Sequence, residues 1–115
     1  MLLDMQQAWV NDVGVVTLRG KLALSRDGQR IEDMAEEFTR AGHRKLVLNI
    51  TDVNYIDSAA IGMLAMTAGK LKQAGGKMVL VSSPTGRTTQ LLKLTQVNMI
   101  VPMFETVDDA LAAVA

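Results

Sequence analysis

Residues 46–64, LVLNITDVNYIDSAAIGML, decide how this chain folds. The run 46–50 is short and almost continuously apolar, which is typical of a buried strand in a parallel sheet. Residues 51–57 are more polar and indicate a loop. A helix is expected from Ser58 to about Ala74, where Gly75 and Gly76 end it. The stretch therefore predicts a strand–loop–helix unit of an α/β protein.

Upstream of this unit the pattern predicts a β-hairpin followed by a helix. Residues 6–10 and 15–18 are expected to be short strands joined by a turn at 11–14. A helix is expected from about residue 26 to 41, with Ser25 as its cap and Gly42 as its stop.

Downstream, the alternation of strands and helices continues. Residues 78–81 are a further buried strand, and a helix is expected from Ser83-Pro84 to about Thr95. Residues 99–103 are expected to form an edge strand because they contain Pro102, and residues 106–114 a closing helix. The order β-β-α-β-α-β-α-β-α predicts a small mixed sheet, a hairpin followed by mostly parallel strands, with about four helices mainly on one face.

Composition limits what this chain can be. Its 115 residues fit one domain, which we expect to span residues 1–115. Without cysteine there is no disulfide, thiol nucleophile or thiolate metal site. A formal net charge of zero and 3% aromatic residues argue against direct binding to nucleic acid. With no apolar run long enough for a membrane span and no signal peptide, a cytoplasmic location is expected.

No catalytic motif is complete in this sequence. His43, the only histidine, lies in a polar helix–strand corner without convergent partners. Ser58 lacks the flanking glycines of a nucleophile elbow. Gly86-Arg87-Thr88 resembles the end of a phosphate-binding loop, but Val81 stands where its first glycine belongs. The sequence therefore predicts a protein that is not an enzyme, with no catalytic residue, metal or cofactor.

The helix that begins at Ser58 is unusual because residues 58–69 contain no charge. A surface helix normally has a polar face, so this half is either covered by neighbouring elements or meets a partner. Asp57 or Ser58 can serve as its N-cap. A serine hydroxyl at a helix N-terminus is also a suitable phosphate acceptor, because helix amides tolerate an anion there. Phosphorylation would then place negative charge beside an apolar surface.

These residues carry a family resemblance. The strand–loop–Asp57-Ser58–helix unit with Gly62 resembles the signature of STAS domains, specifically bacterial anti-sigma factor antagonists. The resemblance extends over residues 15–22 with their Gly-x-Leu turn, the strands at 45–50 and 75–81, and the helix at 91–97.

The resemblance implies a function. The protein would bind an anti-sigma factor that is also a serine kinase of the histidine-kinase-like ATPase fold, and phosphorylation on Ser58 would end that binding. A serine phosphatase could restore it, and the ATP would belong to the partner. Sigma-factor-dependent transcription would be regulated by this partner switching. The implied partner-binding residues are Ala23 and residues 57–63, namely Asp57, Ser58, Ala59, Ala60, Ile61, Gly62 and Met63.

Three positions differ from the usual family pattern. Ala23 stands where an Asp is common, and Ala59 and Ala60 stand where Ser or Thr and then Gly are common. These differences keep an alternative open, namely a STAS scaffold or adaptor that is not phosphorylated, of the stressosome type or from a lipid-transport ATPase complex.

Overall fold

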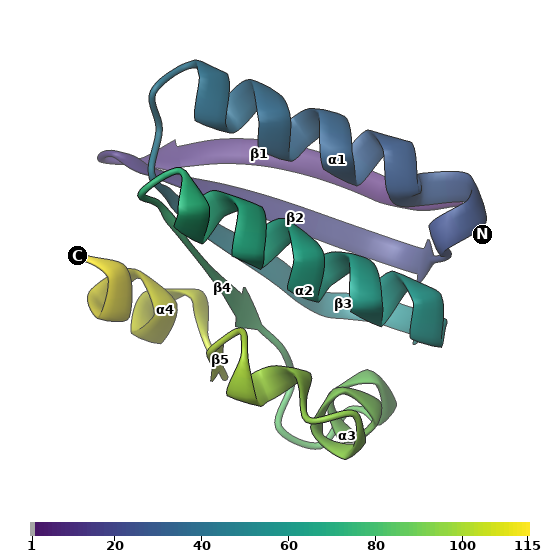
Figure 1. Cartoon of the computed structure of the whole chain (residues 1–115). Helices are drawn as coiled ribbons and strands as arrows, with labels where there is room; N and C mark the ends of the chain where they lie inside the picture. Colours follow the sequence, from purple (N-terminus) through teal and green to yellow (C-terminus); the bar gives the residue numbers. More distant parts are fainter. Residues whose placement is uncertain (1) are drawn as a thin grey trace.

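The computed structural model describes residues 2–115, and these contain a five-stranded sheet in the order β1-β2-β3-β4-β5. β1 and β2 form an antiparallel hairpin, and each later strand lies parallel to its neighbour. The predicted mixed sheet is therefore confirmed (Figure 1). Its strands are β1 (Asp4–Val10), β2 (Val13–Leu22), β3 (Lys45–Ile56), β4 (Lys77–Val81) and β5 (Met103–Phe104).

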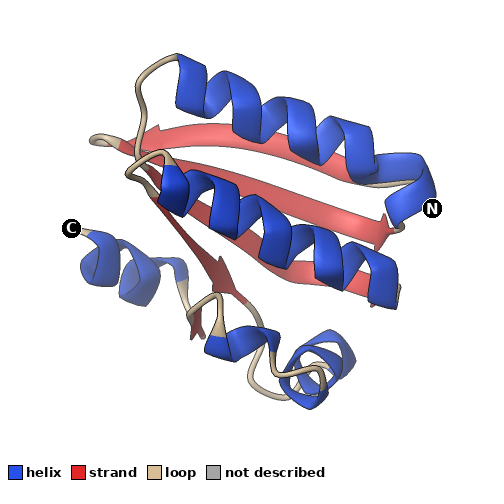
Figure 2. Cartoon of the chain, in the orientation of Figure 1, coloured by secondary structure: helices blue, strands red, loops and turns tan. Residues whose placement is uncertain are grey.

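Helices cover the two faces of the sheet unequally (Figure 2). α1 (Leu24–Arg40), α2 (Ser58–Gln73) and α3 (Arg87–Leu94) bury side chains in the larger core, while α4 (Val107–Val114) packs on the other face. Apolar burial of this kind is the main stabilising contribution to the fold. The expectation of helices mainly on one face is confirmed.

β3 is longer than predicted, because residues 51–56 continue the strand rather than forming a loop. They pair with the end of β2, where the register shifts between Thr17 and Arg19 and again between Gly20 and Lys21. Each shift adds an unpaired residue to β3, as in a β-bulge. The bulges break the alternation of apolar and polar residues, which is why the sequence pattern indicated a loop.

The start of α1 also differs from expectation. The N-cap position is Ala23 rather than Ser25, and no side chain at that position caps the helix. The end of the helix agrees with the prediction, since the residues after Arg40 form a turn in which Gly42 has a φ of 90°.

Two elements of the C-terminal third differ from the prediction. The predicted third helix starts late, at Arg87, because the Gly86 amide bonds to the Ser83 carbonyl in a turn that precedes it. The predicted strand at 99–103 is wrong. Gln96, at a left-handed φ of 61°, leads into the short 3-10 helix η1 (Val97–Met99) instead, and the edge strand β5 follows. α4 begins after its cap Thr106, as expected. Among residues 2–115, no helix has the length and apolarity required to cross a membrane.

Candidate functional site

Asp57 is the N-cap of α2 and fixes where this helix begins. Its backbone is extended, and its carboxylate Oδ1 accepts a hydrogen bond from the Ala60 amide at 2.7 Å. The Asp57 carbonyl accepts the bond from Ile61 N, at 3.1 Å, that opens the helix. Capping of this kind stabilises a helix by about 0.5–2 kcal/mol. The predicted cap is confirmed, and it is Asp57 rather than Ser58 that fills the position.

The same carboxylate connects α2 to the junction between β2 and α1. The Leu24 amide lies 3.4 Å from Asp57 Oδ1 and 3.3 Å from Oδ2. The Asp57 amide in turn lies 3.4 Å from the Leu22 carbonyl. Asp57 therefore holds the N-terminal ends of α1 and α2 side by side.

A second carboxylate organises the α1 side of this junction. Asp27 is buried, and its Oδ2 accepts a hydrogen bond from the Ala23 amide at 3.0 Å. Arg26 lies 3.1 Å from the same carboxylate oxygen and donates to the Lys21 carbonyl at 2.6 Å. Asp27 thus satisfies the Ala23 amide from within the first turn of α1. Sequence reasoning missed Asp27, although an acidic residue in the first turn of a helix was the available signal.

Ser58 is the first residue of α2 and is exposed. One helical turn apart along the same side, Ala59, Gly62 and Met66 are exposed as well. We refer to Ser58, Ala59, Gly62 and Met66 as the outer face of α2. None of these side chains carries a charge, and Met66 is 62% exposed.

Three of the implied partner-binding residues lie beneath this surface instead. Ala60, Ile61 and Met63 are buried, and all three belong to the main core. The side chains of Ala60 and Ile61 support α2 from beneath, and Met63, 5% exposed, reaches only the lining of the groove beside it. The Ala60 methyl group in particular points into the core, so it does not occupy the space in front of Ser58. Ala23 is half-buried at the β2–α1 junction.

Gly62 has no packing partner that would explain a glycine. A Cβ built at this position meets nothing within 4 Å, and the same holds at Gly69 further along the helix. Both are interior positions of α2, where glycine is less favourable than alanine by about 1 kcal/mol. Contacts among residues 2–115 therefore do not account for a glycine at either position.

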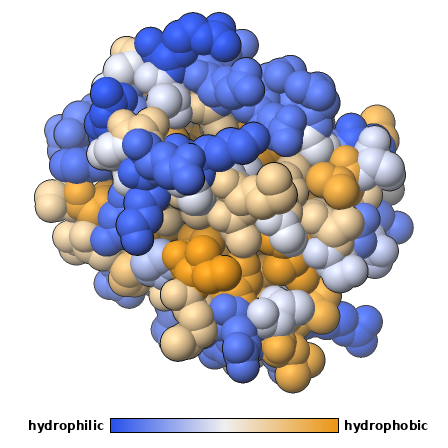
Figure 3. Space-filling view, viewed as in Figure 1, coloured by the Kyte–Doolittle hydropathy of each residue, from blue (hydrophilic) through white to orange (hydrophobic). Residues whose placement is uncertain are grey.

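The outer face borders a groove between α1 and α2. Towards the Ser58 end its volume is about 510 Å³, and its lining includes Leu24, Ala59, Gly62, Met63 and Met66. Figure 3 shows hydrophobic colours over α2 and below it, while α1 is largely hydrophilic. The exposed Leu24 was missed by sequence analysis, since its exposure depends on where α1 begins.

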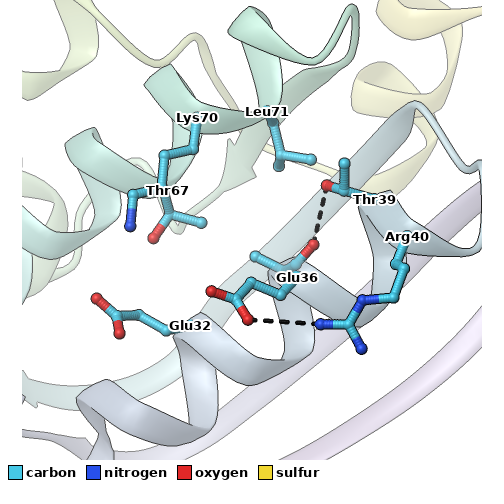
Figure 4. Close-up of a pocket in the computed structure, with 8 residues that line it drawn as sticks. Glu32, Glu36, Thr39, Arg40, Thr67, Lys70 and Leu71 are labelled. Carbon is cyan, nitrogen blue, oxygen red and sulfur yellow. Dashed lines mark hydrogen bonds and ion pairs between the residues drawn. The ribbon is translucent and has the colours of Figure 1, made fainter.

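The groove becomes polar towards the other end of the helices. There a cavity of about 300 Å³ lies between Glu32, Glu36 and Arg40 of α1 and Thr67 and Lys70 of α2 (Figure 4). Figure 4 also shows the ion pair of Glu36 and Arg40, at 3.7 Å. Glu32, Thr67 and Lys70 line both parts, so the groove is more apolar towards Ser58 without being free of charge there.

Comparisons with known proteins identify the family. The profile of the STAS domain family matches residues 6–110, so the chain belongs to that family. A Thermotoga neapolitana protein, named as a candidate anti-sigma factor antagonist, is 33% identical over 79 residues, which cover 69% of each chain.

Solved structures show the same fold. The crystal structure of a candidate anti-sigma factor antagonist from Thermotoga maritima is 26% identical and superimposes with a TM-score of 0.84, covering 96% of this chain and 93% of that one. The Bacillus protein SpoIIAA in its phosphorylated form shares the fold at 18% identity and a TM-score of 0.71, covering 97% of this chain and 100% of the other. The chain is therefore a STAS domain similar to anti-sigma factor antagonists.

Proposed function

We propose that this protein is an anti-sigma factor antagonist that acts by partner switching in the cytoplasm. Unphosphorylated, it binds an anti-sigma factor that is also a serine kinase, through the outer face of α2. Phosphorylation of Ser58 by that partner ends the complex. The role is binding rather than catalysis, and the ATP is held by the partner, so the chain itself uses no cofactor or metal.

The observation that carries this proposal is Gly62 on an exposed and uncharged helix face. Its lack of a side chain lowers helix stability and meets no packing need among the residues that the structure describes. A partner whose backbone approaches α2 closely would require that bare position. Because Gly62 lies one turn from Ser58, a partner seated on Gly62 would also reach the serine hydroxyl.

The environment of Ser58 suits a reversible phosphate. The N-terminal amides of the 16-residue helix α2 favour a nearby anion, and Lys21 and Arg26 lie at the adjoining β2–α1 junction. The domain would therefore stay folded when modified. A phosphoserine adds about −1.5 to −2 charge at pH 7. The phosphate would lie beside the Asp57 carboxylate and the groove. An uncharged partner surface would have to bury that charge without a counter-charge, which weakens binding.

The test is phosphorylation by each candidate serine kinase of the source genome in the presence of ATP, followed by intact-mass analysis and peptide mapping. We expect one phosphate on Ser58. Ser58→Ala should remove it, while Ser25→Ala, which changes an exposed serine at the start of α1, should not. In binding assays Ser58→Ala should keep the partner and Ser58→Asp should lose it, both with unchanged circular dichroism. Equal affinity of the two variants would contradict the switch.

The alternative of an unphosphorylated scaffold or adaptor rests on Ala23 and Ala60, which stand where the family commonly has Asp and Gly. A scaffold would form a stable complex, and neither ATP nor phosphatase treatment would change the mass of the protein or its affinity for the complex. That outcome would leave the STAS fold and the outer face of α2 in place and remove only the role of Ser58.

A further inference from the structure

The outer edge of β1 is an open sheet edge. β1 is the terminal strand of the sheet and pairs only with β2, and among residues 2–115 no other strand reaches it. In Figure 1 it runs along the rim of the sheet with α1 over one face. It is seven residues long, and six of the seven are exposed. The proposed function uses the outer face of α2 and leaves this edge unused.

Hairpin geometry determines which backbone groups point outward. The turn has two residues, Asn11 and Asp12, and Asn11 has a φ of 55°. In a hairpin with a two-residue turn, the flanking pair Val10–Val13 exchanges both backbone hydrogen bonds, and such pairs alternate along the strands. Residues 10, 8, 6 and 4 therefore bond to β2. The amides and carbonyls of Met5, Gln7 and Trp9 are left facing outward.

Within β1 itself nothing discourages strand pairing; just before the strand, Arg30 of α1 donates a hydrogen bond to the Leu3 carbonyl at 2.9 Å. Proteins commonly protect an edge strand with a lysine, a proline, a bulge or an inward-pointing charge. After Asp4, β1 contains no charged residue and no proline, and its pairing with β2 is regular. Of the nine exposed large apolar side chains of the described residues, three lie on or next to β1, namely Leu2 at 71%, Trp9 at 50% and Val10 at 40%.

We propose that this edge binds a second copy of the same chain, with the two β1 strands antiparallel about a two-fold axis at Gln7. In this register Gln7 faces Gln7 of the second copy, and Met5 faces Trp9 of the second copy on each side of the axis. All outward-facing residues then form hydrogen-bonded pairs, which adds about six backbone hydrogen bonds. A methionine sulfur against an aromatic ring is itself a favourable contact.

The charge within β1 is compatible with this arrangement. The only charged residue of the strand, Asp4, faces Val10 of the second copy, so the two Asp4 carboxylates lie at opposite ends of the paired segment. That separation is about 20 Å, beyond the screening length at physiological ionic strength. Because each chain has one such edge, pairing closes at a dimer with a continuous ten-stranded sheet.

Sedimentation equilibrium from about 1 µM to 1 mM, the range of weak association, tests the proposal. We expect the mass to rise from monomer to dimer and no further. Emission of Trp9, the only tryptophan, should shift along the same curve. Gln7→Lys places two lysines directly opposite each other at the axis, with Cα atoms about 5.5 Å apart, and should shift dimerisation at least tenfold to higher concentration. The matched control Gln90→Lys, on α3, should not.

Cysteine cross-linking tests the register, since the chain contains no cysteine of its own. Across the two-fold axis, Gln7→Cys places two thiols where a disulfide can form, because Cα atoms of a hydrogen-bonded pair lie about 5.5 Å apart. We expect Gln7→Cys to form a covalent dimer on mild oxidation much faster than Gln90→Cys. A monomer throughout the range, association that Gln7→Lys leaves unchanged, or equal cross-linking of both cysteine variants would overturn the proposal.

Discussion

α1 and α2 pack on the same face of the same sheet, yet their solvent sides are opposite in character. α1 exposes Glu32, Asp33, Glu36 and Glu37, as a surface helix normally does. The exposed side of α2 has no charge until Lys70. Both helices bury apolar side chains in one core, so packing does not explain the difference. The contrast shows that α1 has the polar face of an ordinary surface helix, whereas the first half of α2 exposes a face without charge.

The N-terminal ends of the two helices also differ. α2 has a side-chain cap, Asp57, whereas α1 has Ala23 at the cap position and relies on Asp27 in its first turn. Asp57 also bonds to α1, through the Leu24 amide. The α2 terminus therefore positions both helices. The exposed Ser58 directly follows this capped terminus.

The largest effect is expected from exchanging the character of the two faces. Met66→Glu places a carboxylate on the outer face of α2, and affinity for the anti-sigma partner should fall about 100-fold, because a charge without a partner is costly to bury in an interface. The reverse exchange on α1, Glu37→Met, should leave affinity unchanged. Both positions are exposed, so unfolding free energies should stay within about 0.5 kcal/mol of wild type.

Titration calorimetry with the purified partner, alongside urea unfolding, distinguishes these expectations. A loss of affinity in Glu37→Met equal to that in Met66→Glu would place the partner on both helices and end the contrast between them.

An intermediate effect is expected at the cap. Asp57→Ala removes the acceptor for the Ala60 and Leu24 amides and should lower the unfolding free energy by about 1–2 kcal/mol. Asp57→Asn keeps an oxygen acceptor and should lower it by much less. Thermal or urea unfolding measures both. If Ala and Asn behaved alike, the carboxylate would not be acting as a cap.

Much of this could be predicted from sequence, and the exceptions have physical reasons. The bounds of α2 agreed with expectation because Asp57 and Gly75 mark its ends through local chemistry. The end of β3 did not, because the two register shifts against β2 are a property of the pair of strands and leave no local pattern.

The same distinction applies within the site. Met63 and Met66 are three residues apart in one uncharged run, yet one is 5% exposed and the other 62%. Sequence alone could not set the rotation of a helix whose residues are small or apolar on all sides. Packing against α1 and the sheet sets it, and so decides which residues are available to a partner.

The smallest effect is expected at the two bare glycines of α2. Gly62→Ala and Gly69→Ala add a methyl group into open space, so each should raise the unfolding free energy by about 0.5–1 kcal/mol. Only Gly62→Ala should weaken partner binding, since Gly62 lies on the outer face one turn from Ser58, whereas Gly69 lies beyond it. The pair is matched in chemistry and in helix, which isolates position. A Gly62→Ala protein that is more stable and binds as tightly as wild type would mean that the partner does not approach this turn, and the uncharged face would then need another explanation.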